Sequence, residues 1–235
     1  PCDVMLDFCQ YEYISFDCYG TLINWENGIL NYLRPLIAGK GCAVADDELL
    51  AFYSEVEPRE QAGEYRSYRD VLASVIRAFA QEFRFAVTAS EAAGLAESIR
   101  DWQPFPDTVP ALERLKSRYK LAILSNIDDD LFAYSDAKLA VGFDAVITAQ
   151  QAKGYKPRIA NFQLLLNRLG IGKDRLLHVA ESLFHDVVPA HSLGIATVWV
   201  NRRQGKKAAA TKLVEAQPDL EVRTLAELAD RALAG

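Results

Sequence analysis

The feature that most constrains the fold is an alternation of short apolar runs with helix-like stretches. The runs are rich in β-branched and aromatic residues and span 11–17, 120–126, 143–150, 176–182 and 196–201. Helix-like stretches separate the later runs, at 128–140, 157–170 and 184–194. This alternation is typical of a parallel sheet covered by helices on both faces. Because the runs are nearly continuously apolar, we predict an α/β fold whose strands are buried on both sides.

The segment from 24 to 103 breaks that rhythm, with four helical patterns and no convincing strand. In 68–83 the apolar residues recur every three or four positions, which indicates an amphipathic helix. Thr88 and Glu91 have the spacing of a capping box at the start of another helix. We therefore predict an all-helical domain at 24–103, inserted into a core domain formed by 1–23 and 104–235.

Prolines and charges suggest further boundaries. Pro35 and Pro58 interrupt helical patterns and predict kinks or helix ends. The proline-rich segment 103–110 is typical of a linker that returns the chain to the core. The stretch that begins at Lys206 and Lys207 predicts the start of a solvated helix.

Composition restricts the partners of the chain. Its net charge of −6 argues against a nucleic-acid surface, which needs a basic stripe. The first residues lack the charged and apolar regions of a signal peptide, and no apolar run is long enough to span a bilayer. The four cysteines form no CxxC pair, so a zinc site is not expected. We expect a cytoplasmic protein that binds a small molecule, with no nucleic-acid or membrane partner.

Polar residues recur where the predicted strands end. In an open parallel sheet, ligands bind at the carboxyl ends of the strands. Each residue taken alone fits ordinary turn or capping chemistry. As an ordered set they supply a nucleophile, a cation to balance its charge, and hydrogen-bond donors. The set consists of Asp17 and Thr21, Ser125 and Asn126, Lys156, and then Glu181, Ser182 and Asp186.

This set resembles the haloacid dehalogenase superfamily, and within it the L-2-haloacid dehalogenases. The motifs read DCYGT at 17–21, SN at 125–126, YKP at 155–157 and AESLFHD at 180–186. The resemblance extends over 12–201. It implies a Rossmann-like parallel sheet with an inserted all-helical cap domain, and a hydrolase whose nucleophile is an aspartate.

Tyr19 distinguishes two branches of that superfamily. The phosphatases carry a second aspartate two residues after the nucleophile, which protonates the departing alkoxide. This chain has Tyr19 there, as the dehalogenases do. A halide leaves as a stable anion and needs no proton. The resemblance therefore implies cleavage of a carbon–halogen bond in short 2-haloalkanoic acids, without a cofactor.

The resemblance also assigns roles. Asp17 attacks C2 of the substrate and forms an aspartyl ester, which water then hydrolyses. Lys156 keeps Asp17 ionised, and Asp186 steers the water. Hydrogen bonds from Thr21, Ser125 and Asn126 hold the nucleophile and the substrate carboxylate, and Tyr19 and Ser182 also contact the substrate.

The resemblance further implies a cap arginine that helps to bind halide and precedes a Glu-Tyr pair. In REQAGEYRSYR, at 59–69, Arg59 has the matching position, and Arg66 and Arg69 are alternatives. Each of them also fits an exposed polar helix face. The resemblance to the dehalogenases implies a homodimer as well.

Two departures keep other functions open. The fourth motif has one residue more than the dehalogenase pattern and is similar to the phosphatase form, and Phe162 stands where the dehalogenases have tyrosine. Asp17, Glu181 and Asp186 together could hold Mg²⁺. The alternatives are a Mg²⁺-dependent phosphatase acting on a small ester, another hydrolase of the superfamily, and a non-catalytic small-molecule binding protein. His185 is a candidate base but also fits a structural role, and we interpret His178 as a satisfied sheet residue.

Overall fold

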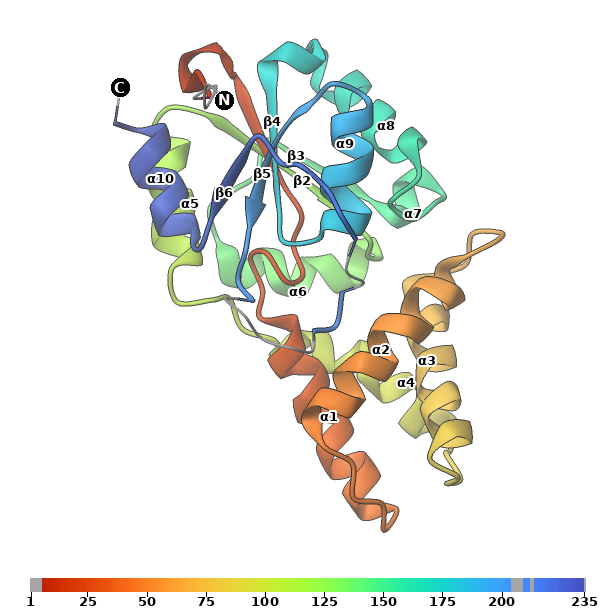
Figure 1. The fold of residues 1–235 in the computed structure, drawn as a ribbon. Helices are drawn as coiled ribbons and strands as arrows, with labels where there is room; N and C mark the ends of the chain where they lie inside the picture. The colour runs from red at the N-terminus through yellow and green to blue at the C-terminus, as the bar shows by residue number, and fades with distance from the viewer. Residues whose placement is uncertain (1–5, 204–208, 212–213, 235) are drawn as a thin grey trace.

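The protein folds around a six-stranded parallel sheet (Figure 1). The computed structural model describes residues 6–203, 209–211 and 214–234. The strand order is β3-β2-β1-β4-β5-β6. This arrangement confirms the predicted fold class. The strands are β1 (Tyr13–Phe16), β2 (Lys120–Ser125), β3 (Ala145–Thr148), β4 (Leu176–Ala180), β5 (Ala196–Val200) and β6 (Leu220–Val222).

The sequence patterns miss β6, which is short and lies at the edge of the sheet. Its three residues pair with β5 from Val198 to Val200. A three-residue strand is too short for a recognisable alternation of apolar and polar positions, so only pairing with its neighbour identifies it.

Helices cover both faces of the sheet (Figure 1). One face packs against α5 (Thr108–Lys116) and α10 (Leu225–Ala232), and the other against α8 (Ile159–Leu169) and α9 (Val188–Ser192). Because side chains alternate along a strand, Ile14 and Phe16 belong to the first layer, while Ser15 faces the second. The remaining core helices and turns are η1 (Phe8–Gln10), α6 (Asp129–Leu139), α7 (Ala149–Ala152), η3 (Lys173–Arg175) and η4 (Leu183–Val187).

Four helices form an insert between β1 and β2, and Figure 1 shows them on one side of the sheet, beyond the ends of the strands. We call these helices the helical insert. Thr88 forms the predicted capping box with Glu91. The insert consists of α1 (Trp25–Gly39), α2 (Asp46–Gln61), α3 (Tyr68–Glu82) and α4 (Ala89–Ser98), followed by η2 (Ile99–Asp101).

Three boundary expectations need correction or remain open. Pro35 and Pro58, expected to mark kinks or helix ends, lie inside α1 and α2, so neither of them ends a helix. The predicted linker 103–110 is shorter, because α5 already begins at Thr108. The stretch beginning at Lys206 lies outside the described residues.

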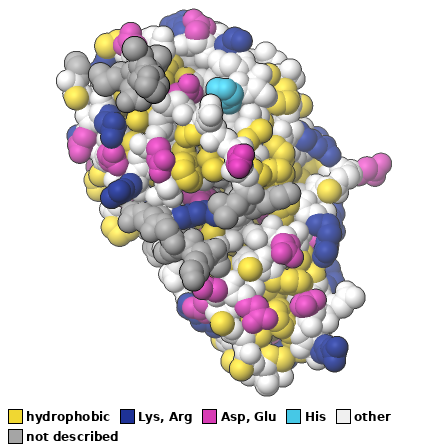
Figure 2. All heavy atoms as spheres, in the orientation of Figure 1, with side chains coloured by type: hydrophobic (Ala, Val, Ile, Leu, Met, Phe, Trp, Pro, Cys, Tyr) yellow, Lys and Arg dark blue, Asp and Glu magenta, His cyan; other side chains and the backbone are white. Residues whose placement is uncertain are grey.

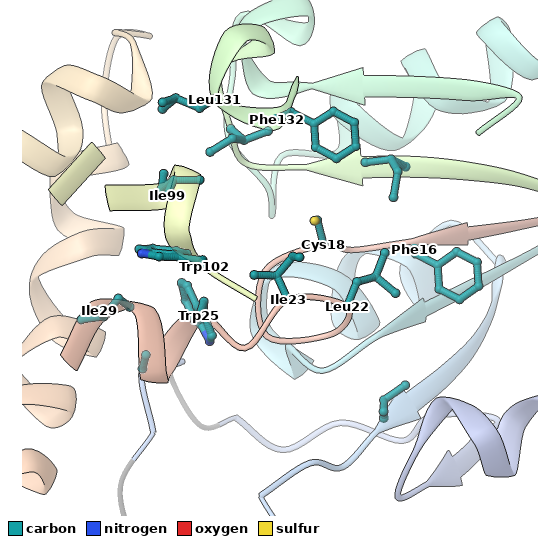
Figure 3. Close-up of a cluster of buried hydrophobic side chains, with 14 of the residues drawn as sticks. Phe16, Cys18, Leu22, Ile23, Trp25, Ile29, Ile99, Trp102, Leu131 and Phe132 are labelled. Atoms are coloured by element: carbon teal, nitrogen blue, oxygen red, sulfur yellow. The ribbon is translucent and has the colours of Figure 1, made fainter. Parts of the chain in front are cut away.

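A hydrophobic cluster joins the helical insert to the core (Figure 3). Cys18, Leu22 and Ile23 follow β1, and they meet Trp25 at the start of α1 and Trp102 from the returning chain. All five are buried. Burying a large apolar side chain stabilises a fold by about 1.5–3 kcal/mol. The loop that carries the candidate nucleophile is therefore held by packing on both sides.

A polar contact also joins the two parts. Asp128 follows β2 and is 3% exposed, and its carboxylate accepts hydrogen bonds from the backbone amides of Tyr68 and Arg69 at 2.9 and 3.0 Å. These are the first two amides of α3, which lack partners within their own helix. A core carboxylate thus caps a helix of the insert.

Charged side chains of both signs are interspersed over the face drawn in Figure 2. In the part of the chain that the structure describes, no helix has the length and apolar character needed to cross a membrane.

Candidate active site

Asp17 follows β1 directly, at the carboxyl end of the strand. It is 7% exposed, and its Oδ2 accepts a 2.9 Å hydrogen bond from the hydroxyl of Thr21. The chain turns sharply at Gly20, where φ is +95° and a Cβ atom would lie 2.9 Å from the indole nitrogen of Trp25. This turn requires glycine, and it brings Thr21 back to the carboxylate of Asp17.

Lys156 reaches the same point from the loop after β3 and α7. Its ammonium donates hydrogen bonds to Asp17 Oδ1 at 2.9 Å, to Asp186 Oδ1 at 2.7 Å and to the carbonyl of Leu124 at 2.9 Å. The amide of Asn126 fixes the loop, because it bonds both the N–H and the carbonyl of Lys156, at 2.7 and 3.1 Å. The lysine side chain is 1% exposed, so both of its ion pairs are buried.

Asp186 enters the site from η4, a π-helical turn after β4. The amides of Asp186 and Val187 both donate a hydrogen bond to the carbonyl of Ser182, at 3.2 Å. Because the bond from Val187 spans five residues, this turn holds one residue more than a turn of α-helix. The extra residue in the fourth motif is thus absorbed locally. It leaves the carboxylate of Asp186 in contact with Lys156.

Asp186 is followed by a buried relay, a chain of hydrogen bonds formed by His178 and Ser15. His178 Nε2 lies 2.8 Å from Asp186 Oδ1, and His178 Nδ1 lies 2.8 Å from the hydroxyl of Ser15. With Nε2 protonated, His178 donates to the carboxylate and accepts from Ser15, so every polar atom of the relay has a consistent partner. Sequence reasoning correctly predicts a satisfied His178 but misses its contact with the site.

The two aspartates differ in their pKa values. Burial raises the pKa of Asp17 above its usual range, and Lys156 and Thr21 oppose this rise only in part. Burial acts on Asp186 in the same direction, but Lys156 and His178 outweigh it and lower the pKa. Asp186 therefore stays ionised at a more acidic pH than Asp17.

A small cavity of about 30 Å³ opens above these residues, between the core and the helical insert. Space of this size admits only a few heavy atoms. Its core side includes Asp17, Tyr19, Ser125, Lys156 and Asp186. Its insert side includes Trp25 from α1, Glu57 from α2 and Tyr68 from α3.

Three buried polar atoms of the cavity lining have no hydrogen-bond partner among the described residues: Ser125 Oγ, Asp186 Oδ2 and His185 Nε2. His185 Nδ1 lies 3.0 Å from the hydroxyl of Ser182. Burial lowers the pKa of His185 to about 4, so its ring is neutral near neutral pH. The cavity thus presents a hydroxyl, a ring nitrogen and one carboxylate oxygen that are available to a ligand.

A family model for haloacid dehalogenase-like hydrolases matches residues 11–194. The protein belongs to that hydrolase family. (S)-2-haloacid dehalogenase H-109 of Pseudomonas putida is 28% identical over 224 residues, which cover 93% of this chain and 96% of that protein. Haloacetate dehalogenase H-2 of Moraxella sp. (strain B) is 26% identical over 199 residues, covering 82% and 87%.

A solved structure agrees in fold. The L-2-haloacid dehalogenase from Xanthobacter autotrophicus with chloropropionic acid covalently bound matches with a TM-score of 0.80 and 21% identity, over 96% of this chain and 99% of that one. Recognition of this family from the sequence is therefore confirmed.

Most of the predicted residues of this haloacid dehalogenase-like hydrolase meet at one place. Tyr19 lines the cavity, and its hydroxyl bonds Ser135 at 2.9 Å, so the ring rather than the hydroxyl faces a ligand. Asn126 also lines the cavity, but its amide is engaged by the backbone of Lys156. The predicted residues brought together are Asp17, Tyr19, Thr21, Ser125, Asn126, Lys156, Ser182 and Asp186.

The structure does not bring Arg59 into this site. Its side chain is 67% exposed and lies 3.9 Å from Glu60. Arg66 bonds Glu60 and Ser74, and Arg69 pairs with Asp130 and Glu97. α2 turns Arg59 outward and Glu57 inward, so the position that matches the family pattern does not reach the cavity.

The three carboxylates expected to hold Mg²⁺ do not converge either. Glu181 turns to Arg203 and Thr211, with contacts of 2.9 and 3.0 Å. The ammonium of Lys156 bridges the other two carboxylates, those of Asp17 and Asp186. The predicted ligand set therefore does not fit a magnesium ion as the side chains are arranged.

Glu57 is a site residue that sequence reasoning misses. It is 3% exposed and faces the cavity from α2. A signal was present, since Glu57 follows Leu50 and Tyr53 at seven and four positions and so shares their buried helix face. An acid on an apolar helix face indicates either a partner or a function.

Proposed function

We propose that this protein hydrolyses the carbon–halogen bond of short 2-haloalkanoic acids through an aspartyl-ester intermediate. The observation that carries the proposal is the ammonium of Lys156, which bridges Asp17 and Asp186 beneath the helical insert. The carboxylate of Asp17 thus lies beside an ammonium group at a cavity of about 30 Å³. That volume favours the shortest substrates, and the names of the relatives agree with this chemistry.

In the first step, a carboxylate oxygen of Asp17 attacks C2 of the substrate. The new carbon–oxygen bond forms as the carbon–halogen bond breaks, and the bonding electrons leave with the halide. No proton is needed by the leaving group, which agrees with Tyr19 in place of an acid. Lys156 and Thr21 hold the carboxylate in position, and we propose that the helical insert acts as a cap that excludes water from this step.

In the second step, water attacks the carbonyl carbon of the ester. Asp186 Oδ2 accepts its proton, since Oδ1 is already occupied by Lys156 and His178 and Oδ2 has no partner among the described residues. The tetrahedral intermediate then expels the alkoxide, which takes the proton from Asp186 to give the 2-hydroxy acid. Asp17 is left as a carboxylic acid and becomes a carboxylate again by releasing its proton to solvent.

The test is halide release from chloroacetate, bromoacetate and 2-chloropropionate, with EDTA or with added Mg²⁺, next to phosphate release from generic esters. We expect halide release that EDTA does not affect, and its loss in Asp17→Asn. In a single turnover with excess enzyme in heavy-oxygen water, the label should enter Asp17 and not the product. Label in the first product, or EDTA-sensitive phosphate release alone, would contradict the proposal.

A further inference from the structure

Glu57 is an acid that the proposed mechanism does not use, although it forms part of the cavity wall. It comes from α2 of the helical insert and shares the cavity with Asp17 and Lys156. It is 3% exposed, so almost none of its surface reaches bulk solvent. A buried acid is costly unless it is neutral or well paired. The groups that hydrogen-bond Glu57 therefore determine which of its oxygens can bind a ligand.

The hydrogen bonds of Glu57 are all made by one oxygen. Oε1 accepts from the amide of Gln61 at 2.6 Å and from the hydroxyl of Tyr68 at 3.1 Å. The hydroxyl of Tyr53 lies 3.3 Å from that of Tyr68. Oε2 accepts no hydrogen bond from any described residue. One edge of the carboxyl group is thus fixed by the insert, and the other is left for the cavity.

No cation is free to meet the substrate among the described residues that line the cavity. Lys156 is the single lysine or arginine in that lining, and its three N–H groups are used by Asp17, Asp186 and Leu124. The carboxylate of a 2-haloacid would therefore enter a cavity that already holds two aspartates. It needs uncharged donors, and a protonated Glu57 is one.

We propose that Glu57 is the specificity-determining residue of the helical insert, and that it binds the substrate carboxylate as a neutral carboxylic acid through a hydrogen bond from Oε2–H. This inference rests on the proposed function, because it concerns the same site and substrate. It differs from the role expected of Arg59, which was to help bind the halide, because Glu57 would bind the carboxylate of the substrate. The hydroxyl of Ser125, which has no partner among the described residues, is placed to act as a second donor.

The proposal makes binding depend on pH. The groups that face Glu57 are Tyr53 and Gln61 on α2, Tyr68 on α3, and, from the core, Asp17, Lys156 and Tyr155. Burial raises the pKa of Glu57 to about 7, and Asp17 adds to the rise while Tyr68 and Lys156 oppose it. Above that pH the donor is lost, and the ionised Glu57 adds a third carboxylate that repels the substrate. The KM for an anionic substrate should then rise about tenfold for each pH unit.

The variant that tests this is Glu57→Gln, since glutamine keeps an uncharged donor and cannot ionise. With 2-chloropropionate as the substrate, we expect KM to rise above about pH 7 in the wild type and to stay constant in Glu57→Gln. Glu55→Gln, an exposed acid on the same helix, should behave as the wild type. Chloroacetamide, which is uncharged, should show no such rise with either protein. A wild-type KM that stays constant, or one that rises equally in Glu57→Gln, would overturn the inference.

A binding measurement separates this inference from the proposed function. Propionate is an unreactive carboxylate, and its binding near pH 8 can be followed by calorimetry in buffers of different ionisation enthalpy. We expect uptake of about one proton per propionate in the wild type and much less in Glu57→Gln. Proton-linked binding without halide release would refute the dehalogenase but retain the role of Glu57. Halide release with no difference in proton uptake between the two proteins would support the dehalogenase and refute the role of Glu57.

Discussion

At the residue scale, the chemistry of the site depends on the few polar atoms that have no hydrogen-bond partner among the described residues. Asp186 illustrates this, because Lys156 and His178 both bond its Oδ1 and leave Oδ2 toward the cavity. The relay from Ser15 through His178 therefore sets the orientation of the carboxylate. His178 touches neither substrate nor nucleophile, so it is a positioning residue in our proposal.

Replacing His178 by phenylalanine should impair the second step more than the first. In His178→Phe the carboxylate of Asp186 loses one of the two donors to Oδ1 and is held by Lys156 alone, so hydrolysis of the ester should slow by about tenfold or more. Rapid-quench measurements should show a halide burst of normal rate followed by slow turnover. Ser15→Ala should give a weaker form of the same pattern, and His191→Asn, an exposed histidine on α9, should have no effect. Equal loss in burst and turnover would show that His178 is only structural.

At the element scale, the contact between core and insert is centred on the start of α3. Asp128 caps that helix, and the hydroxyl of Tyr155 donates to the carbonyl of Arg66 at 2.8 Å in the loop before it. The same helix supplies Tyr68, which bonds Glu57. The position of α3 relative to the sheet thus controls one wall of the cavity.

Removing this cap should weaken both stability and substrate binding. For Asp128→Ala, we expect the free energy of unfolding to fall by about 1–3 kcal/mol, because two buried amides at the start of α3 lose their charged acceptor while the N-cap Ser67 remains. KM should rise because the wall formed by Tyr68 and Glu57 is less well placed. Asp101→Ala, an exposed acid in the insert, serves as the control in urea unfolding and in the kinetic assay. An unchanged KM in Asp128→Ala would mean that α3 is positioned by apolar packing alone.

At the scale of the whole molecule, a buried acid links stability to pH. The pKa of Glu57 is raised to about 7 in the folded state from an ordinary value of 4.5. Between these two values the folded protein binds more protons at Glu57 than the unfolded chain does. Its contribution to stability is therefore present at low pH and decreases as the pH rises through that window.

Glu57→Gln should remove this dependence. We expect the wild type to lose about 3 kcal/mol of unfolding free energy relative to Glu57→Gln as the pH rises from about 4.5 to about 7. Urea unfolding of both proteins at a series of pH values measures the difference directly, because all other titrating groups are shared. Parallel curves would show that Glu57 has an ordinary pKa in the folded protein.

The sequence by itself determined the class of fold and most of the residues that meet at the candidate active site. Parallel strands carry their polar residues to one edge, so the order of Asp17, Ser125, Lys156 and Asp186 along the chain was enough to predict that they meet. Tyr19 could be interpreted as well, since it lies two residues after the candidate nucleophile Asp17.

Only the tertiary structure decided which groups of the insert face the cavity. The rotation of α2 exposes Arg59 and buries Glu57. The spacing of Glu57 from Leu50 and Tyr53 indicates that it is buried, but only the packing of the helix shows that it lines the cavity. The same holds for Glu181, which pairs with the distant Arg203, and for His178, whose partner Asp186 depends on the π-helical turn. The groups that a buried helix face meets, and the pairing of side chains, arise from contacts between segments far apart in the chain, and spacing along the sequence does not encode them.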